Sequence, residues 1–109
     1  MPQHLCSLSE LAEGQPIAVE AEIAGSSESL ILVRVADSVR AYLNICPHAG
    51  RRLDWAPGRF LLERGQLVCA AHGASFELAQ GVCMGGPCRG QSLRAVDVRI
   101  EGEDVVMAD

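Results

Sequence analysis

The chain changes character at residues 45–76, which read ICPHAGRRLDWAPGRFLLERGQLVCAAHGASF. Proline and glycine recur through this stretch, and its hydrophobic periodicity is weak. It contains two short clusters of sulfur and imidazole side chains, Cys46-Pro47-His48 and, after 20 intervening residues, Cys69-Ala70-Ala71-His72. Each cluster directly follows a segment with strand character, where a loop can aim two side chains at one point. We therefore expect an irregular, functional insertion between regular strands.

The segments before this stretch predict three successive antiparallel strands. Apolar residues alternate with polar or small ones over Gln15–Ile23, Ser29–Val35 is rich in β-branched residues, and Val39–Leu43 continues the pattern. Turns are expected between these strands at Gly25-Ser26-Ser27 and at Ala36-Asp37-Ser38.

Strand signals continue within the insertion and after it. They fall at Arg59–Leu62, Gln66–Val68, Ala74–Leu78, Val82, Leu93–Ile100 and Val105–Met107. Only Ser7–Glu13 predicts a short helical turn or an edge segment, with Ser7 as N-cap and Glu10 three residues later. The predicted fold class is all-β.

Length and composition limit the classes of protein that remain. With 109 residues, of which 49% are hydrophobic and 21% charged, the chain should form one folded domain over residues 1–109. No apolar run approaches the roughly 20 residues that cross a bilayer. Residues 1–15 lack the features of a secretory signal, so the expected compartment is the cytoplasm. A net charge of −5 argues against nucleic acid as a partner.

The two clusters together offer two thiolates and two neutral imidazoles. This set suits an iron–sulfur cluster in which the cysteines hold one iron and the histidines hold the other. It also suits tetrahedral zinc. The chain has five cysteines, an odd number that argues against a purely disulfide framework in a cytosolic protein.

These residues resemble those of the Rieske 2Fe-2S proteins, specifically the small ferredoxins that serve bacterial oxygenases. The resemblance covers nearly the whole chain and implies stacked antiparallel sheets with a cluster-binding subdomain inserted at about residues 45–76. It implies that one 2Fe-2S cluster is bound by four residues, Cys46, His48, Cys69 and His72. Other positions similar to the family's are Gly73, Phe76, the proline loop Gly85-Gly86-Pro87 and the closing strand Val96–Ile100.

The chain departs from the family's high-potential members in ways that bear on its potential. Those members carry an extra cysteine in each cluster motif, whereas this chain has Arg51 and Ala71, so their disulfide cannot form. Ala74 and Phe76 stand where those members have a hydroxyl-bearing serine and tyrosine. Ser75 should point away because side chains alternate along an extended segment. The expected reduction potential therefore lies near the bottom of the Rieske range of about −150 to +300 mV.

The resemblance implies a one-electron carrier that takes electrons from a flavin reductase and passes them to a terminal oxygenase. The chain ends at Asp109, nine residues after Ile100, without the mononuclear iron domain of the large oxygenase subunits, so we expect a carrier and not an enzyme. Two alternatives stay open at this point. One is the small subunit of an NADH-dependent nitrite reductase, which shares this architecture, and the other is a zinc-stabilised interaction module.

Several remaining residues have simpler interpretations. Cys83 and Cys88 could form a functional disulfide or a redox relay, but the sequence favours two small buried thiols. Cys6 is also predicted to be an ordinary thiol. Trp55 is predicted to pack in the core under the long loop. The pair Arg51-Arg52 is predicted to place positive charge beside the cluster, where it would orient acidic partners.

Overall fold

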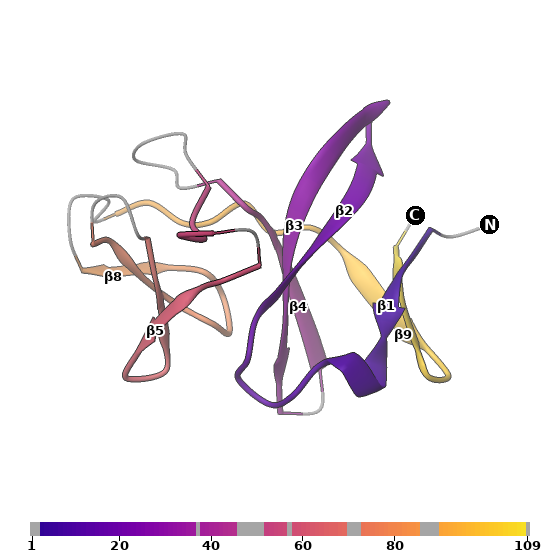
Figure 1. Ribbon diagram of the computed structural model, residues 1–109, viewed down its shortest axis with the longest axis horizontal. Coiled ribbons are helices and arrows are strands. Elements are labelled where there is room, and N and C mark those ends of the chain that lie inside the picture. The colour runs from indigo at the N-terminus through magenta and orange to yellow at the C-terminus, as the bar shows by residue number, and fades with distance from the viewer. Residues whose placement is uncertain are drawn as a thin grey trace.

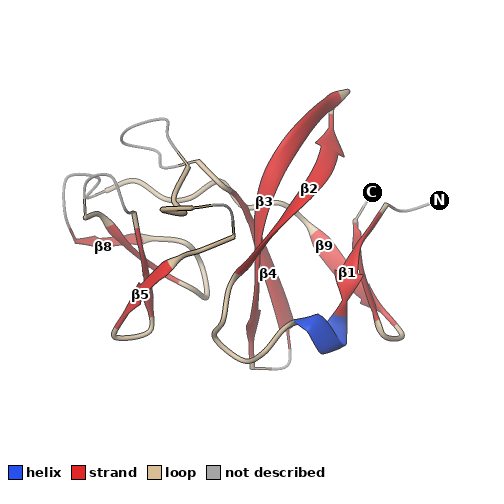
Figure 2. Ribbon diagram, in the orientation of Figure 1, coloured by secondary structure: helices blue, strands red, loops and turns tan. Residues whose placement is uncertain are grey.

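Small antiparallel sheets make up the fold (Figures 1 and 2). The computed structural model describes residues 3–36, 38–45, 52–56, 58–69, 73–85 and 90–108. Its regular elements are strands and one short 3-10 helix, which confirms the all-β prediction. The elements are β1 (His4–Ser7), η1 (Leu8–Glu10), β2 (Ile17–Ile23), β3 (Ser26–Val35), β4 (Ser38–Leu43), β5 (Leu61–Glu63), β6 (Gln66–Val68), β7 (Ser75–Glu77), β8 (Cys83–Gly85), β9 (Val98–Glu101) and β10 (Asp104–Met107).

The strands are arranged in three sheets within the described part of the chain. The terminal sheet has the order β1-β10-β9, the central sheet β2-β3-β4, and the small sheet β5-β6-β7-β8. In Figure 1 the small sheet lies to the left of the central sheet and the terminal sheet lies to its right, together with both chain ends. The predicted succession of three antiparallel strands is therefore confirmed as the central sheet.

Strand β3 is buried on both of its faces. Ile31 and Val33 pack in one hydrophobic cluster with Phe76 of the small sheet. Leu32, which points the other way, packs in a second cluster with Val105 of the terminal sheet. Coverage on both sides explains why the middle of this strand is a continuous apolar run and not an alternating one.

The two turns of the central sheet are tighter than predicted. Ile23 pairs with Ser26, so the first turn is the two residues Ala24 and Gly25, and the serines predicted for the turn belong to β3. Both turn residues have positive φ, 52° and 83°, which is the geometry that matches the twist of a two-residue hairpin. At the second turn Ser38 likewise belongs to a strand, since it pairs with Val35.

The strand predicted over Leu93–Ile100 is mostly not a strand. Only its last three residues lie in β9, because the chain changes partners along this stretch. The N–H of Leu93 donates to the carbonyl of Gly81 beside the small sheet, at 2.8 Å. Three residues later the N–H of Val96 donates to Ala41 of β4, at 2.9 Å. The stretch is a crossover from the small sheet to the other two sheets.

The small sheet differs from its predicted bounds by one or two residues. Its first strand begins at Leu61, because Arg59 is used in an isolated bridge to Ala56. Its last strand covers Cys83–Gly85 and does not include Val82, which bridges to Ser92 instead. The sheet thus continues past residue 76, the expected end of the inserted subdomain.

The short helix begins as the sequence predicts. Ser7 is its N-cap, and the Ser7 N–H donates to the carboxylate of Glu10 at 2.6 Å. No helix in the part of the chain that the structure describes is long and apolar enough to cross a membrane.

Tyr42 and Gly81 form a tight contact between the central and small sheets. The Tyr42 hydroxyl donates to the carbonyl of Leu78 at 2.7 Å, and burial is the main reason that the pKa of this phenol rises to about 12. Gly81 has a φ of 72°, and a Cβ added there would lie 2.8 Å from Cε1 of the Tyr42 ring. Glycine is therefore required here both by conformation and by space.

We predict that Gly81→Ala destabilises the fold by about 2 kcal/mol or more, because it combines positive-φ strain with overpacking. Gly25→Ala is the matched control, since Gly25 also has positive φ but open space around it. That control should cost only about 1–2 kcal/mol, the strain alone. Thermal unfolding of the two variants measures the difference, and equal losses would show that the Tyr42 contact does not constrain Gly81.

Candidate metal centre

Cys69 is the one predicted ligand that lies within the described residues. It directly follows β6 and is completely buried. Its N–H donates to the carbonyl of Ala74 at 2.6 Å, and its carbonyl accepts from the N–H of Gly73 at 2.9 Å. Gly73 has a φ of 74°, which glycine adopts without strain. These bonds close the base of the second ligand segment, which we define as residues 69–74.

The other three predicted ligands, Cys46, His48 and His72, lie outside the described residues. Accordingly, no group of three metal-binding side chains is found among the residues that the structure does describe. The structure does place the ends of the segments that carry these ligands.

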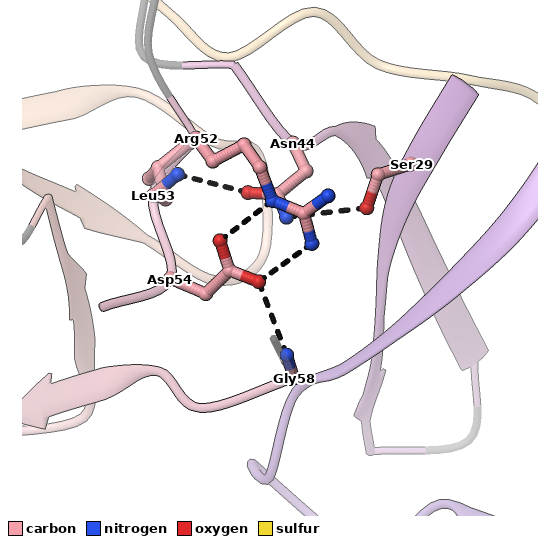
Figure 3. A network of polar contacts seen from close by, with 6 residues as sticks. All are labelled: Ser29, Asn44, Arg52, Leu53, Asp54 and Gly58. Atoms are coloured by element: carbon pink, nitrogen blue, oxygen red, sulfur yellow. Dashed lines mark hydrogen bonds and ion pairs between the residues drawn. The ribbon is translucent and has the colours of Figure 1, made fainter. Parts of the chain in front are cut away.

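The first ligand segment, residues 45–52, is closed by a buried amide (Figure 3). Asn44 directly follows β4 and is 1% exposed. Its side-chain Oδ1 accepts the N–H of Leu53 at 2.9 Å, and its Nδ2 donates to the hydroxyl of Ser29 at 3.2 Å. Its backbone N–H also donates to the Ser29 carbonyl at 3.0 Å. The residues on either side of the first ligand segment are thus tied to each other and to β3.

The described ends of the two ligand segments pack in one hydrophobic cluster beside the small sheet. Leu53, just after the first segment, and Cys69, which opens the second, are both completely buried in the same hydrophobic cluster. Gly85 pairs with Ser75, so the predicted proline loop leaves the sheet beside the strand that follows the second segment. The convergence of the four ligand side chains themselves stays a prediction, because three of them lie outside the described residues.

Arg52 is bound within the chain. Its Nε and one terminal nitrogen donate to the two carboxylate oxygens of Asp54, at 2.9 and 2.8 Å (Figure 3). The Asp54 side chain is only 2% exposed and also accepts the N–H of Gly58 at 3.1 Å. The hydrogen bonds from Arg52 are the main reason that the pKa of Asp54 is lowered, against the opposing effect of burial.

This pairing bears on the role predicted for the arginine pair. The charge of Arg52 is paired with Asp54 within the chain, while its side chain stays 48% exposed, so the role of the arginine pair toward partners stays a prediction. Arg51 lies outside the described residues.

The residues at the end of the second ligand segment and the start of β7 share a buried apolar cluster with Cys69. Ala74 and Phe76 are completely buried in the cluster that contains Cys69. The side chain of Ser75 lies on the opposite side of β7. Its Oγ is 3.4 Å from the position that a Cβ on Gly85 would occupy. The alternation expected from the sequence is therefore observed.

This arrangement fits an iron–sulfur centre. A buried thiol at a strand end, in an apolar setting and beside a second tied segment, provides a rigid site from which thiolate and imidazole donors can converge. An apolar surround also limits access of water to such a centre.

The cysteines outside the ligand set have different states. Cys83 is disulfide-bonded, with its partner outside the described residues, so the prediction of a thiol at this position is wrong. Cys83 is buried at the start of β8, opposite Phe76, where the strand register is irregular. Cys6 is a buried free thiol as predicted, and burial followed by the charge of Glu10 raises its pKa.

Trp55 is also placed differently from the prediction. It is 59% exposed, whereas the sequence suggested core packing. The backbone N–H of Trp55 donates to the carbonyl of Arg59 in a tight turn, at 3.0 Å. The residue of this segment that is buried in the core is Leu53.

Sequence reasoning missed the polar residues that hold the first ligand segment. Asn44 and Asp54 have no distinctive spacing relative to Cys46 and His48, and their partners lie on another strand or in a turn. The available signal was weak. An asparagine at the end of an apolar strand, directly before a metal-binding motif, indicates a buried amide that closes a loop.

Comparison with known proteins gives a consistent assignment. A family model for the Rieske [2Fe-2S] domain matches residues 1–105. The ferredoxin of carbazole 1,9a-dioxygenase from Nocardioides aromaticivorans IC177 is 31% identical, with 99% of this chain and 97% of that chain covered and a TM-score of 0.74. The Sphingomonas yanoikuyae B1 ferredoxin is 25% identical, with 100% and 99% covered and a TM-score of 0.78.

A third solved structure shares the fold at lower identity. It is described as the small subunit of a putative NADPH nitrite reductase and is 21% identical, with 100% of this chain and 99% of that chain covered and a TM-score of 0.67. No curated protein matches the chain.

The disulfide at Cys83 predicts a thiol count. After unfolding and removal of any metal without reductant, three of the five cysteines should react with a thiol reagent, because a disulfide consumes two. Addition of a reductant should raise the count to five. Five reactive thiols before reduction would show that Cys83 is a thiol, as the sequence had suggested.

Proposed function

The chain belongs to the Rieske [2Fe-2S] domain family, and on that premise we propose that it passes single electrons from a flavin reductase to a terminal oxygenase. Its cofactor is one Rieske-type [2Fe-2S] cluster. The observation that carries the proposal is the 31% identity, over nearly the full length of both chains, to the ferredoxin of a dioxygenase. A ferredoxin transfers electrons and leaves the reaction on the substrate to its partner enzyme.

We assign the four cluster ligands to Cys46, His48, Cys69 and His72. When bound, the cluster accepts and releases one electron at a time. The chain's own residues hold the donors in place. The hydrogen bonds of Cys69 to Ala74 and Gly73 hold the second segment, and those of Asn44 hold the ends of the first.

The apolar face beside Cys69 supports a low reduction potential. Ala74 and Phe76 are buried there and carry no hydroxyl group. Hydroxyl hydrogen bonds to cluster or ligand sulfur stabilise the more negative reduced state, so their absence lowers the potential. A low potential suits a carrier whose electrons go to an oxygenase.

The small subunit of a nitrite reductase is the second candidate function. It is favoured by the structure that shares the fold over nearly the whole of both chains. At 21% identity that likeness shows the fold alone, so we place this function second. The zinc alternative has lost its basis because the matched family is an iron–sulfur family. We further propose a single domain over residues 1–109 and a cytoplasmic location.

The function is tested by reconstitution. Anaerobically purified protein should contain two irons and two sulfides per chain, as expected for one Rieske cluster. NADH with the flavin reductase of an oxygenase system should reduce it, and a terminal oxygenase with its substrate should reoxidise it. Single variants Cys46→Ser, His48→Ala, Cys69→Ser and His72→Ala should each lose the characteristic visible and EPR signals, whereas Cys6→Ser should keep them. Copurification with a large sirohaem protein, with no transfer to an oxygenase, would favour the nitrite reductase function instead.

The potential is tested by restoring hydroxyl groups. We predict that Ala74→Ser and Phe76→Tyr each raise the midpoint potential by about 40 mV, since a hydrogen bond about 1 kcal/mol stronger in the reduced state corresponds to that shift for one electron. Ser75→Ala, on the opposite side of β7, is the control and should leave the potential unchanged. Potentiometric titration followed by EPR makes the measurement. A wild-type potential well above 0 mV would contradict the low-potential proposal.

A further inference from the structure

A buried amide spans the ends of the first ligand segment. Asn44 lies two residues before Cys46, and Leu53, whose N–H it binds, lies five residues after His48. Among the polar and charged residues that the structure describes, only Asn44 is buried over both its backbone and its side chain. Figure 3 shows its side chain reaching from the end of β4 to Leu53 on one side and to Ser29 on the other. A single side chain therefore joins the two residues that flank the eight-residue first ligand segment.

The amide is held rigidly in its orientation. Both its oxygen and its nitrogen have partners, at 2.9 Å and 3.2 Å. The backbone of Asn44 is tied to the same serine through the bond from its N–H to the Ser29 carbonyl. Ser29 belongs to β3, so the tie connects the ligand segment to the strand whose middle is buried on both faces.

The far end of the tie is equally constrained. Leu53 is completely buried in the cluster that contains Cys69, so its backbone cannot shift without disturbing that packing. The next residue, Asp54, is bound by Arg52 and by the N–H of Gly58. The Asn44 bond thus joins two anchored points and leaves little freedom to the ends of the segment between them.

We propose that Asn44 is a positioning residue for the cluster, acting through Leu53 to set where the first ligand segment presents Cys46 and His48 relative to Cys69. This inference rests on the ligand set of the proposed function. Outer residues that orient metal ligands typically change metal affinity about 10–100-fold when they are removed. The loss of the amide should affect cluster retention and cluster electronics more than it affects the rest of the fold.

The test compares Asn44→Ala with Tyr42→Phe. Tyr42→Phe is a matched control, because it also removes one side-chain hydrogen bond. That bond goes to Leu78, which follows β7 at the end of the strand away from Ala74 and Cys69. We expect Asn44→Ala to release iron to a chelator about tenfold faster than the wild type. It should also shift the EPR g-values and the midpoint potential. Tyr42→Phe should stay within about twofold in release rate, with g-values and potential unchanged.

Ser29→Ala provides a second, milder variant. It leaves the bond to Leu53 in place but removes the group that orients the amide, so its release rate should fall between those of Tyr42→Phe and Asn44→Ala. If Asn44→Ala does not accumulate as folded protein, Ser29→Ala alone decides the question. A release rate and EPR signal equal to those of Tyr42→Phe would overturn the proposal.

The outcomes separate this inference from the proposed function. A wild-type protein without a cluster, or a Cys46→Ser variant that keeps it, would refute the ligand set itself. A wild-type protein that holds the cluster, combined with equal effects of Asn44→Ala and Tyr42→Phe on release and spectra, would show that Asn44 is a general stabiliser and nothing more.

Discussion

The burial of β3 on both faces is the constraint on which the rest of the structure depends. Its apolar side chains alternate between the cluster shared with the small sheet and the cluster shared with the terminal sheet. Full burial of a leucine, isoleucine or valine side chain contributes about 1.5–3 kcal/mol, so the completely buried residues Leu30–Val33 stabilise the packing of the central sheet against both of its neighbours. The metal-binding end of the molecule and the end that carries the termini are therefore built on the same strand.

The small sheet needs this support because its own strands are short. Each of its four strands has three residues, which is at the lower limit for a stable sheet. Hydrogen bonds at the ends of this sheet add the stability that longer strands would otherwise provide. The buried amide of Asn44, the carboxylate of Asp54 and the backbone bonds of Cys69 each fix a point where the chain enters or leaves a ligand segment.

The same packing shapes the electronic environment of the centre. Because side chains alternate along β7, Ala74 and Phe76 share the buried face with Cys69, while the hydroxyl of Ser75 lies on the other side. An apolar, tightly packed surround disfavours added negative charge. It also limits structural rearrangement on electron transfer. The proposed low potential would therefore share its origin, the packing of the small sheet, with the fixed ends of the ligand segments.

Much of the fold, and the family, could be predicted from the sequence, because the signals are local. Alternation and a run of β-branched residues predicted the central strands, and the spacing within Cys46-Pro47-His48 and within Cys69 to His72 indicated the family and the proposed donor set. Contacts between distant residues could not be predicted in this way. The tie from Asn44 to Leu53 and the bond from Tyr42 to Leu78 carry no local pattern.

The sequence by itself determined the class of the fold, the kind of metal centre and the absence of hydroxyl groups at Ala74 and Phe76. Only the tertiary structure decided that Arg52 is neutralised by Asp54, that Trp55 is exposed and that Leu93–Ile100 crosses between sheets. The physical reason is that side-chain type and periodicity act over a few residues, whereas pairing and burial depend on which distant segments the fold brings together.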